Sequence, residues 1–556
     1  MSKAEKRLRE IESQLDEAMY NLPIYKINRD KALQLVASLY ESLEMALQLQ
    51  VVRSQDHPEA LSEAEKKSES LKGALATAIQ HINNICPETE GENGVGQPAI
   101  DQCIELLGTS SLYQYVEVNY KGIRPGILSP SIEEDSPDQI TIAFRPVDDK
   151  VQRYEIMNEI LIEENSRLYQ DRMSAIKQAL HKKYPKLTNW RLKDAYYSAI
   201  ADSQTDLLFH LPDEMDLAGY KVKDIKHVWS KLLYKAYMAS HAARKDCLPI
   251  LDKIGVLPEH MLPNLLYFID VDEFDGVDRH VVESILDDLT FGTMKGKQKY
   301  GSLMTEPLIQ LTDGARFVSP TFISHNLAGR NINATLNRIY AGTVDKDTVS
   351  KEAYFVHELE SILKLFPALK GGGPTQLPGD LPDVDYAIYD PISKTMVALE
   401  MKWITEPVTA QEIVSRDEDL YKGLHVQIPN YKAGITANLE SFMKKTFEEI
   451  DPVDHIDYFV LTKISIGSGK INDDSNRIIN IRMLKKALFD HGGNLYEATQ
   501  ALRTGAYLPQ ENVHYKIVEN RYPFAGVNFI TCGKEVLEPF SLQTPDDLKF
   551  FPGKIE

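Results

Sequence analysis

The chain has 556 residues and a net charge of −20 at pH 7, with 43% hydrophobic and 26% charged residues. This length predicts about three or four domains with sizeable hydrophobic cores. The acidic balance argues against a protein that coats nucleic acid nonspecifically, because that affinity rises with the lysine and arginine at the interface. A local basic patch remains compatible with this charge.

The sequence shows no sign of export or membrane insertion. It lacks a run of about 18 apolar residues, and the charged N-terminus lacks the apolar core of a secretory signal. The cysteines are too scattered for a zinc knuckle or a disulfide framework; they are Cys86, Cys103, Cys247 and Cys532. We therefore expect a cytoplasmic protein with no membrane partner.

Residues 1–120 are predicted to form a helical N-terminal region. The segment INRDKALQLVASLYESLEMALQLQ spaces its apolar residues three or four apart, which is typical of an amphipathic helix. The region is either a packed helical domain, which we favour, or an arm that binds a protein partner or forms a homo-oligomer. Its heptads are too short to predict a coiled coil.

Residues 121–340 are predicted to be a mixed α/β and helical middle region. A hairpin is expected around the polar stretch SPSIEEDSPD and the strand-like QITIAFR, and helices follow. The clearest basic cluster is KGKQKYG, with Lys295, Lys297 and Lys299. Together with Arg316, Arg330 and Arg338, these lysines are candidate DNA contacts, and a solvated loop is the alternative.

The segment 341–470 has a different pattern. A helix precedes two strands that flank DPISKT, and a polar helix and the apolar strand YFVLTKISI follow. This order predicts a compact α/β domain. Residues 471–556 are expected as a C-terminal extension, which either packs on this domain or forms a module of its own.

The two strands carry acidic and basic residues where apolar ones are expected. An antiparallel hairpin centred on residues 392–393 places Asp385 opposite Glu400, on the same face of the sheet. Lys402 shares that face because it lies two residues after Glu400. The hairpin therefore gathers two carboxylates and an ammonium group.

The chemistry of this face follows from its charges. The next opposed residues, Ala387 and Ala398, are small and leave space beside the acids. Two neighbouring carboxylates repel each other unless a cation lies between them, and oxygen ligands suit Mg²⁺ or Mn²⁺. Such an ion polarises a phosphodiester and lowers the pKa of an attacking water, while a lysine stabilises the charge that builds on the phosphorus centre. The set predicts metal-dependent phosphodiester hydrolysis.

At these residues the sequence resembles the PD-(D/E)xK nuclease superfamily. Glu400-Met401-Lys402 matches E-x-K, and Pro382 to Asp385 supplies the upstream part. The resemblance implies a restriction-endonuclease-like fold, in which a mixed sheet is flanked by helices. It also implies that Asp385, Glu400 and the carbonyl of Met401 bind the metal, and that Lys402 assists the nucleophilic water. Asp383, in the literal Pro-Asp dipeptide, is the alternative to Asp385.

Many relatives carry a further glutamate on the helix before the strands. Glu358 is chosen here because it stands at a suitable distance before the strand and flanks the apolar stripe of its helix. Glu352 lies closer to the centre of that stripe, and Glu360 lies on the other flank. All three remain candidates, with Glu358 as the predicted catalytic residue.

Many relatives also carry a glutamine and, four residues later, a tyrosine on the helix after E-x-K. Gln427 and Tyr431 have this spacing, which makes Gln427 a candidate nucleic-acid contact. Pro429 lies between them and disfavours an uninterrupted helix.

Two other motifs fail. HELES, residues 357–361, lacks the second histidine of a zinc-protease helix, because Ser361 stands in its place. GSGK, residues 467–470, resembles the end of a phosphate-binding loop, but Ile464 replaces the earlier glycine and Ile471 the final serine or threonine.

The sequence thus predicts a multidomain α+β protein, with an α/β nuclease core and a mainly helical N-terminal region. The expected function is Mg²⁺- or Mn²⁺-dependent cleavage of DNA, in defence against foreign DNA by analogy only. One alternative is a regulatory or partner-binding protein with a degenerate nuclease-like domain. Another is a metal-dependent phosphoesterase that acts on nucleotides.

Overall fold

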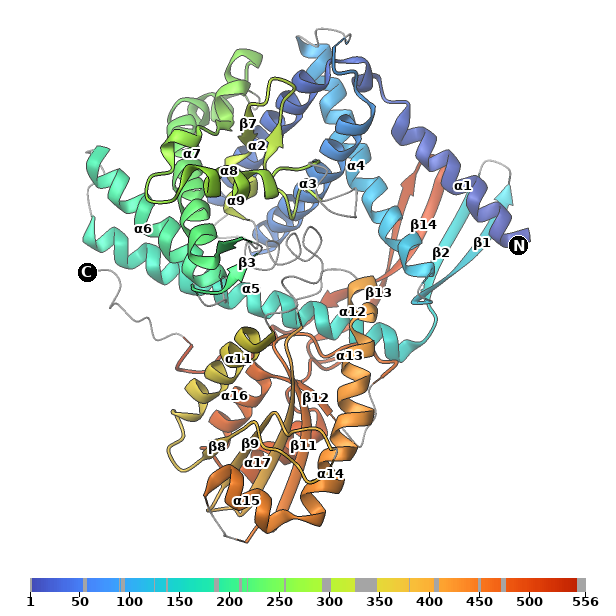
Figure 1. Cartoon of the computed structure of the whole chain (residues 1–556). Helices are drawn as coiled ribbons and strands as arrows, with labels where there is room; N and C mark the ends of the chain where they lie inside the picture. Colours follow the sequence, from blue (N-terminus) through green and yellow to red (C-terminus); the bar gives the residue numbers. More distant parts are fainter. Residues whose placement is uncertain are drawn as a thin grey trace.

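The structure is a computed structural model that describes residues 3–53, 58–89, 91, 96–124, 126–136, 139–184, 190–209, 213–217, 219–254, 257–292, 302–325, 348–379, 381–404, 410–448, 452–471 and 477–547. Figure 1 shows a helical lobe, formed within residues 3–325, above a sheet lobe, formed within residues 348–504. The fold is mixed α/β with a large helical N-terminal region, as the sequence predicts. No helix in the described ranges is both long and apolar enough to cross a bilayer.

The N-terminal helices pack against one another through the apolar stripes that the sequence shows. Leu33, Val36 and Tyr40 of the second helix are buried in one core with Ala78 and Ile82 of the third. A 3₁₀ turn, η1 (Pro23–Lys26), joins the first two helices. The helices are α1 (Lys3–Tyr20), α2 (Arg29–Arg53), α3 (Pro58–Ile85) and α4 (Gln97–Ile123).

A four-stranded sheet joins distant parts of the chain. Its order is β1 (Leu128–Ser136), β2 (Gln139–Pro146), β14 (Val527–Val536) and β13 (Tyr515–Phe524), with β14 parallel to β2. The expected hairpin is confirmed, since β1 pairs antiparallel with β2, and most of the polar stretch lies in β1. This is an edge strand, so Ile132 packs inward while Ser131 and Glu133 are exposed to solvent.

One 35-residue helix, α5 (Asp149–Lys183), crosses between the lobes (Figure 1). Ile156, Ile160 and Leu161 belong to the core of the sheet lobe, whereas Ile176 and Leu180 pack in a cluster with residues of α6 in the helical lobe. The rest of the helical lobe comprises α6 (Trp190–Leu208), β3 (Asp216–Leu217), β4 (Tyr220–Lys221), α7 (Val222–Ile254), η2 (Glu259–Leu265), β5 (Tyr267–Phe268), η3 (Val271–Glu273), α8 (Arg279–Asp288), β6 (Ile309–Gln310), β7 (Arg316–Val318) and α9 (Pro320–Ser324).

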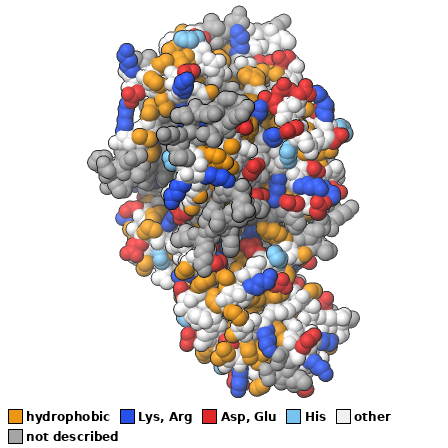
Figure 2. All heavy atoms as spheres, turned by 90° about the vertical axis from the view of Figure 1, so that its left-hand side faces the viewer, with side chains coloured by type: hydrophobic (Ala, Val, Ile, Leu, Met, Phe, Trp, Pro, Cys, Tyr) orange, Lys and Arg blue, Asp and Glu red, His pale blue; other side chains and the backbone are white. Residues whose placement is uncertain are grey.

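The charge of the protein is not segregated on the face seen in Figure 2. Lysine and arginine side chains are scattered there among aspartates and glutamates. Arg316, one of the candidate DNA contacts, forms an ion pair with Asp287. Lys295, Lys297, Lys299, Arg330 and Arg338 lie outside the described residues.

The sheet lobe contains a five-stranded sheet in the order β12-β11-β10-β9-β8. The strands β10, β11 and β12 are parallel, and β9 and β8 run antiparallel to their neighbours. Their bounds are β8 (Lys370–Gly372), β9 (Tyr386–Asp390), β10 (Thr395–Lys402), β11 (His455–Thr462) and β12 (Arg477–Asn480). Every residue of β9 is buried, since helices cover both faces of the sheet.

The flanking helices come before, between and after the strands. Helix α11 (Thr348–Leu363) precedes the sheet, and a helical run connects β10 to β11. That run contains α12 (Ala410–Ser415), α13 (Asp417–Lys422), the π-turn η5 (Gly423–Gln427), α14 (Ile428–Ala437) and α15 (Leu439–Phe447). The final helices are α16 (Ile481–Asp490) and α17 (Leu495–Thr504).

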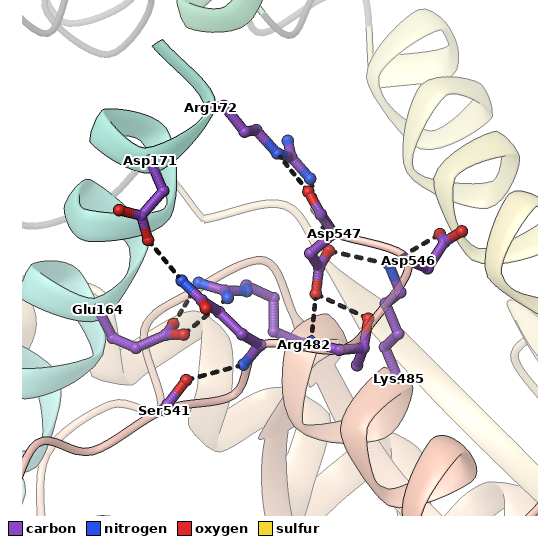
Figure 3. Close-up of polar contacts among 10 residues, drawn as sticks. Glu164, Asp171, Arg172, Arg482, Lys485, Ser541, Asp546 and Asp547 are labelled. Atoms are coloured by element: carbon purple, nitrogen blue, oxygen red, sulfur yellow. Dashed lines mark hydrogen bonds and ion pairs between the residues drawn. The ribbon is translucent and has the colours of Figure 1, made fainter. Parts of the chain in front are cut away.

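The C-terminal segment is divided between both sheets. The expected boundary at residue 470 falls between β11 and β12, which are hydrogen-bonded neighbours, so residues 477–504 belong to the sheet lobe. The strands β13 and β14 belong instead to the four-stranded sheet. After β14 the C-terminal segment packs beside α5 and α16, where polar side chains hold it in place (Figure 3).

The centre of that network is a buried ion pair. Arg482 of α16 donates a hydrogen bond of 2.7 Å to Oε1 of Glu164 of α5, and the Leu542 N–H donates to the same oxygen at 3.0 Å. Lys485 Nζ lies 2.9 Å from Oδ1 of Asp547, and Arg172 of α5 also contacts that oxygen. The contacts join α5, α16 and the C-terminal segment (Figure 3).

Candidate active site

The hairpin β9–β10 has the register that the sequence predicts. Ala387 pairs with Ala398, and Tyr386 pairs with Leu399. Asp385 directly precedes β9 and therefore lies opposite Glu400. Its Oδ2 accepts a hydrogen bond of 2.7 Å from the backbone N–H of Met401. The hairpin thus brings the first carboxylate against the middle residue of the E-x-K motif.

Both carboxylate oxygens of Glu400 are in contact with other side chains. The Tyr431 hydroxyl donates a hydrogen bond to Oε2, and the Lys402 Nζ lies 2.6 Å from Oε1. Oε1 accepts no hydrogen bond with regular geometry in the described residues, so its contact with the ammonium group is an ion pair. The Glu400 side chain is only 1% exposed, whereas that of Lys402 is 25% exposed.

The electrostatics of the site are dominated by the partial burial of two neighbouring carboxylates, Asp385 and Glu400. Burial, and then the negative charge of Glu400, raise the pKa of Asp385 to about 7. The Met401 N–H and the Lys402 ammonium act in the opposite direction. Burial and the charges of Asp385 and Glu400 also raise the pKa of Tyr431, so its hydroxyl stays protonated and donates to Glu400.

The space expected beside the acids is closed by the helical run α13–η5–α14. A methyl group added at Gly423 would lie 3.3 Å from Cγ of Glu400 and 3.3 Å from Cγ2 of Val460. The run approaches the sheet this closely because Gly423 has no side chain. Tyr431 on the same run then reaches Glu400.

Pro429 does not interrupt this helical run, contrary to the expectation from sequence. The π-turn precedes it, and the Ile428 N–H donates to the Gly423 carbonyl five residues earlier. The wider turn, together with the position of Pro429 in the first turn of α14, accommodates a residue that has no N–H to donate. Gln427 and Tyr431 therefore share a helical face, and Oε1 of Gln427 is buried without a hydrogen-bond partner among the described residues.

The glutamates of α11 divide between two places. Glu358 lies 3.5 Å from the Nζ of Lys463, which sits 4.4 Å from the ring centroid of Trp403. Glu352 is the α11 glutamate whose charge contributes to the raised pKa of Asp385. The structure thus pairs Glu358 with Lys463.

The upstream aspartates also differ in position. Asp383 is exposed, whereas Asp385 is partly buried and hydrogen-bonded to Met401. Sequence reasoning missed Gly423, because its importance depends on the close approach of a helix that is distant in sequence. It also missed Lys463, for which the only signal was a lysine at the end of an apolar strand.

The donor atoms suit a magnesium or manganese ion. Asp385, Glu400 and the Met401 carbonyl supply oxygen ligands only, and Mg²⁺ is usually held by one or two carboxylates together with waters and substrate phosphates. Within the described ranges no group of three or more His, Cys, Asp or Glu side chains is arranged to hold a metal. The described residues thus bring two carboxylates together, those of Asp385 and Glu400.

Comparison with known proteins gave no relative. No family model, curated protein or solved structure matches the chain.

Proposed function

We propose that this protein is a metal-dependent nuclease that hydrolyses phosphodiester bonds of DNA. The observation that carries the proposal is the convergence of Asp385, Glu400 and Lys402 at the end of β10, with the Met401 N–H bonded to Asp385. The order of helix α11, strands β8 to β10, connecting helices and the parallel strand β11 supports a restriction-endonuclease-like core. DNA as the substrate, and a role in defence against foreign DNA, rest on the resemblance and on analogy.

The residues have distinct roles in this proposal. Mg²⁺ or Mn²⁺, when bound, would polarise the phosphodiester and lower the pKa of the attacking water. Asp385 and Glu400 would bind the ion, and Tyr431 holds Oε2 of Glu400 in place. The more exposed Lys402 would orient the water and stabilise negative charge on the phosphoryl group.

The test is the degradation of plasmid and linear DNA with Mg²⁺, Mn²⁺ or EDTA. We expect metal-dependent cutting that falls by about a thousandfold in Asp385→Ala and in Lys402→Ala, because several kcal/mol of transition-state stabilisation would be lost. Asp383→Ala is the matched control, since this exposed aspartate lies on the same segment. Cutting that survives both site substitutions, or that fails only in Asp383→Ala, would refute this site.

One observation favours a different function. Lys402 and Tyr431 already occupy both oxygens of Glu400, as expected in a degenerate domain that serves a regulatory or partner-binding role. The two functions differ in metal binding, which titration calorimetry with Mn²⁺ measures. A folded wild-type protein that neither binds Mn²⁺ nor cuts DNA would support the regulatory function. Cleavage of short nucleotides but not of long DNA would indicate a phosphoesterase.

A further inference from the structure

A buried asparagine of α5 holds the loop that follows β11. Asn158 is 1% exposed, and its Oδ1 accepts hydrogen bonds from the Ser465 hydroxyl at 3.0 Å and the Ile466 N–H at 2.9 Å. Its Nδ2 donates to the carbonyls of Gly467, at 2.8 Å, and Tyr154, at 2.7 Å. Both polar atoms of the side chain are thus hydrogen-bonded, and three of these four hydrogen bonds join it to the loop after β11.

The same loop contains the GSGK sequence that resembled a phosphate-binding loop. Gly467 has a φ of +73°, which favours glycine. A methyl group added at Gly469 would lie 2.5 Å from the carbonyl oxygen of Lys150, in the first turn of α5. These glycines therefore allow the loop to pack directly against α5.

The other side of the loop is bonded to the helical run that covers the candidate site. The N–H of Ser468 donates to Oδ1 of the buried Asp417 at 3.0 Å, and the Ser468 hydroxyl donates to its Oδ2. Asp417 begins α13, which continues through Gly423 to the tyrosine that contacts Glu400. A continuous series of buried hydrogen bonds thus runs from α5 to the helical run beside Glu400.

We propose that Asn158 is a positioning residue for the candidate active site, acting through the loop Ser465–Ser468 and Asp417 on the helical run that contacts Glu400. This inference rests on the proposed function. Because the C-terminal part of α5 packs on α6, the arrangement of the helical lobe sets the position of that run. The two lobes are then coupled through α5, with the loop as the connection.

The experiment compares Asn158→Ala with Asn480→Ala in the full-length protein. Asn480 is also buried and donates to the Ile464 carbonyl at 3.1 Å, but it lies at the start of α16 rather than on α5. Both changes remove a buried asparagine beside the same loop. Ser468→Ala is a milder variant in case Asn158→Ala does not fold, since it removes the hydroxyl bonds to Asp417 and to the Lys470 N–H but keeps the Ser468 N–H bond to Asp417.

The readouts are hydrogen exchange of residues 417–437, Mn²⁺ affinity and the kinetics of DNA cleavage. We expect Asn158→Ala to raise exchange in that run by about tenfold or more, corresponding to about one lost hydrogen bond to a buried group. Mn²⁺ binding and kcat should fall, while KM for DNA changes by less than about twofold, because substrate contacts are untouched. Ser468→Ala should likewise raise hydrogen exchange and lower Mn²⁺ binding and kcat.

Two results would overturn the inference. One is unchanged exchange of residues 417–437 in both Asn158→Ala and Ser468→Ala. The other is an equal rise in Asn158→Ala and Asn480→Ala, which would reflect the stability of the loop alone. The exchange measurement needs neither metal nor DNA. A wild type that binds no Mn²⁺ and cuts no DNA would therefore refute the proposed function, while exchange still decides the coupling.

Discussion

The two aspartates at the ends of β9 should respond in opposite ways to the same substitution. Asp385 shares a partly buried place with another carboxylate, and its pKa is raised from 3.8 to about 7. Asp390 is 2% exposed and accepts hydrogen bonds from the Ile392 N–H and the Ser393 hydroxyl. We expect Asp385→Asn to stabilise the metal-free protein at pH 8, and Asp390→Asn to destabilise it.

The magnitude follows from the proton linkage of Asp385. Between pH 3.8 and about 7 the folded protein retains a proton that the unfolded chain has released, so wild-type stability falls as the pH rises through this window. The full shift corresponds to at most about 4 kcal/mol, at 1.36 kcal/mol for each pKa unit. The shift already includes the opposing effect of Lys402, and solvent screening reduces its magnitude, so we expect a gain of about 1–2 kcal/mol at pH 8 and almost none at pH 4.

The assay is urea unfolding in EDTA at pH 4 and pH 8. Trp403, which directly follows the E-x-K motif, reports on the sheet lobe through its fluorescence once Trp190 and Trp229 are replaced by phenylalanine. Asp390→Asn should lose about 1–3 kcal/mol at pH 8, because charged hydrogen bonds are lost from a buried acceptor. Equal destabilisation by the two substitutions at pH 8 would refute the reasoning.

Other substitutions test the rest of the structure. Burial raises the pKa of Glu44 from 4.5 to about 7, so the stability of the wild type falls as the pH rises between these values. We expect Glu44→Gln to be more stable than the wild type at pH 8, by up to about 3 kcal/mol, and equally stable at pH 4. Melting temperatures at the two pH values measure this difference. Glu164→Ala should lose about 3–5 kcal/mol in urea unfolding, because Arg482 keeps a buried charge without its partner, and equal stability of variant and wild type would contradict this. Gly423→Ala gains about 1 kcal/mol of helix propensity but loses about 1–3 kcal/mol by overpacking against Glu400. We therefore expect weaker Mn²⁺ binding in calorimetry. An unchanged affinity would contradict the close approach of the helical run to Glu400.

The hairpin could be predicted from sequence because its determinants are local. The two-residue alternation of β9 and β10 and the small pair Ala387 and Ala398 fix the register, which the structure confirms. The choice among the glutamates of α11 could not be made in the same way. Glu352 and Glu358 are six residues apart on a helix, and only the packing of α11 on the sheet decides which of them approaches Asp385.

The π-turn and the divided C-terminal segment were beyond local reasoning. Pro429 argues for a helix break on its own, and the preceding wide turn is a response to packing on the sheet rather than a pattern of residue types. The pairing of β2 with β14 likewise joins segments that no periodicity relates. By contrast, the hairpin of β1 and β2 was predicted, because its two strands are adjacent in sequence.

The pairing of β2 with β14 has a consequence for how the protein folds during synthesis. Ile140 is opposite Val527, so the hairpin β1–β2 emerges from the ribosome long before the strand that completes its sheet. Until then Ile140, Ile142 and Phe144 lack the cover of Phe529, although α1 and α4 are already present. The apolar face of this unfinished sheet is an aggregation risk in the nascent chain until β14 is synthesised and covers it.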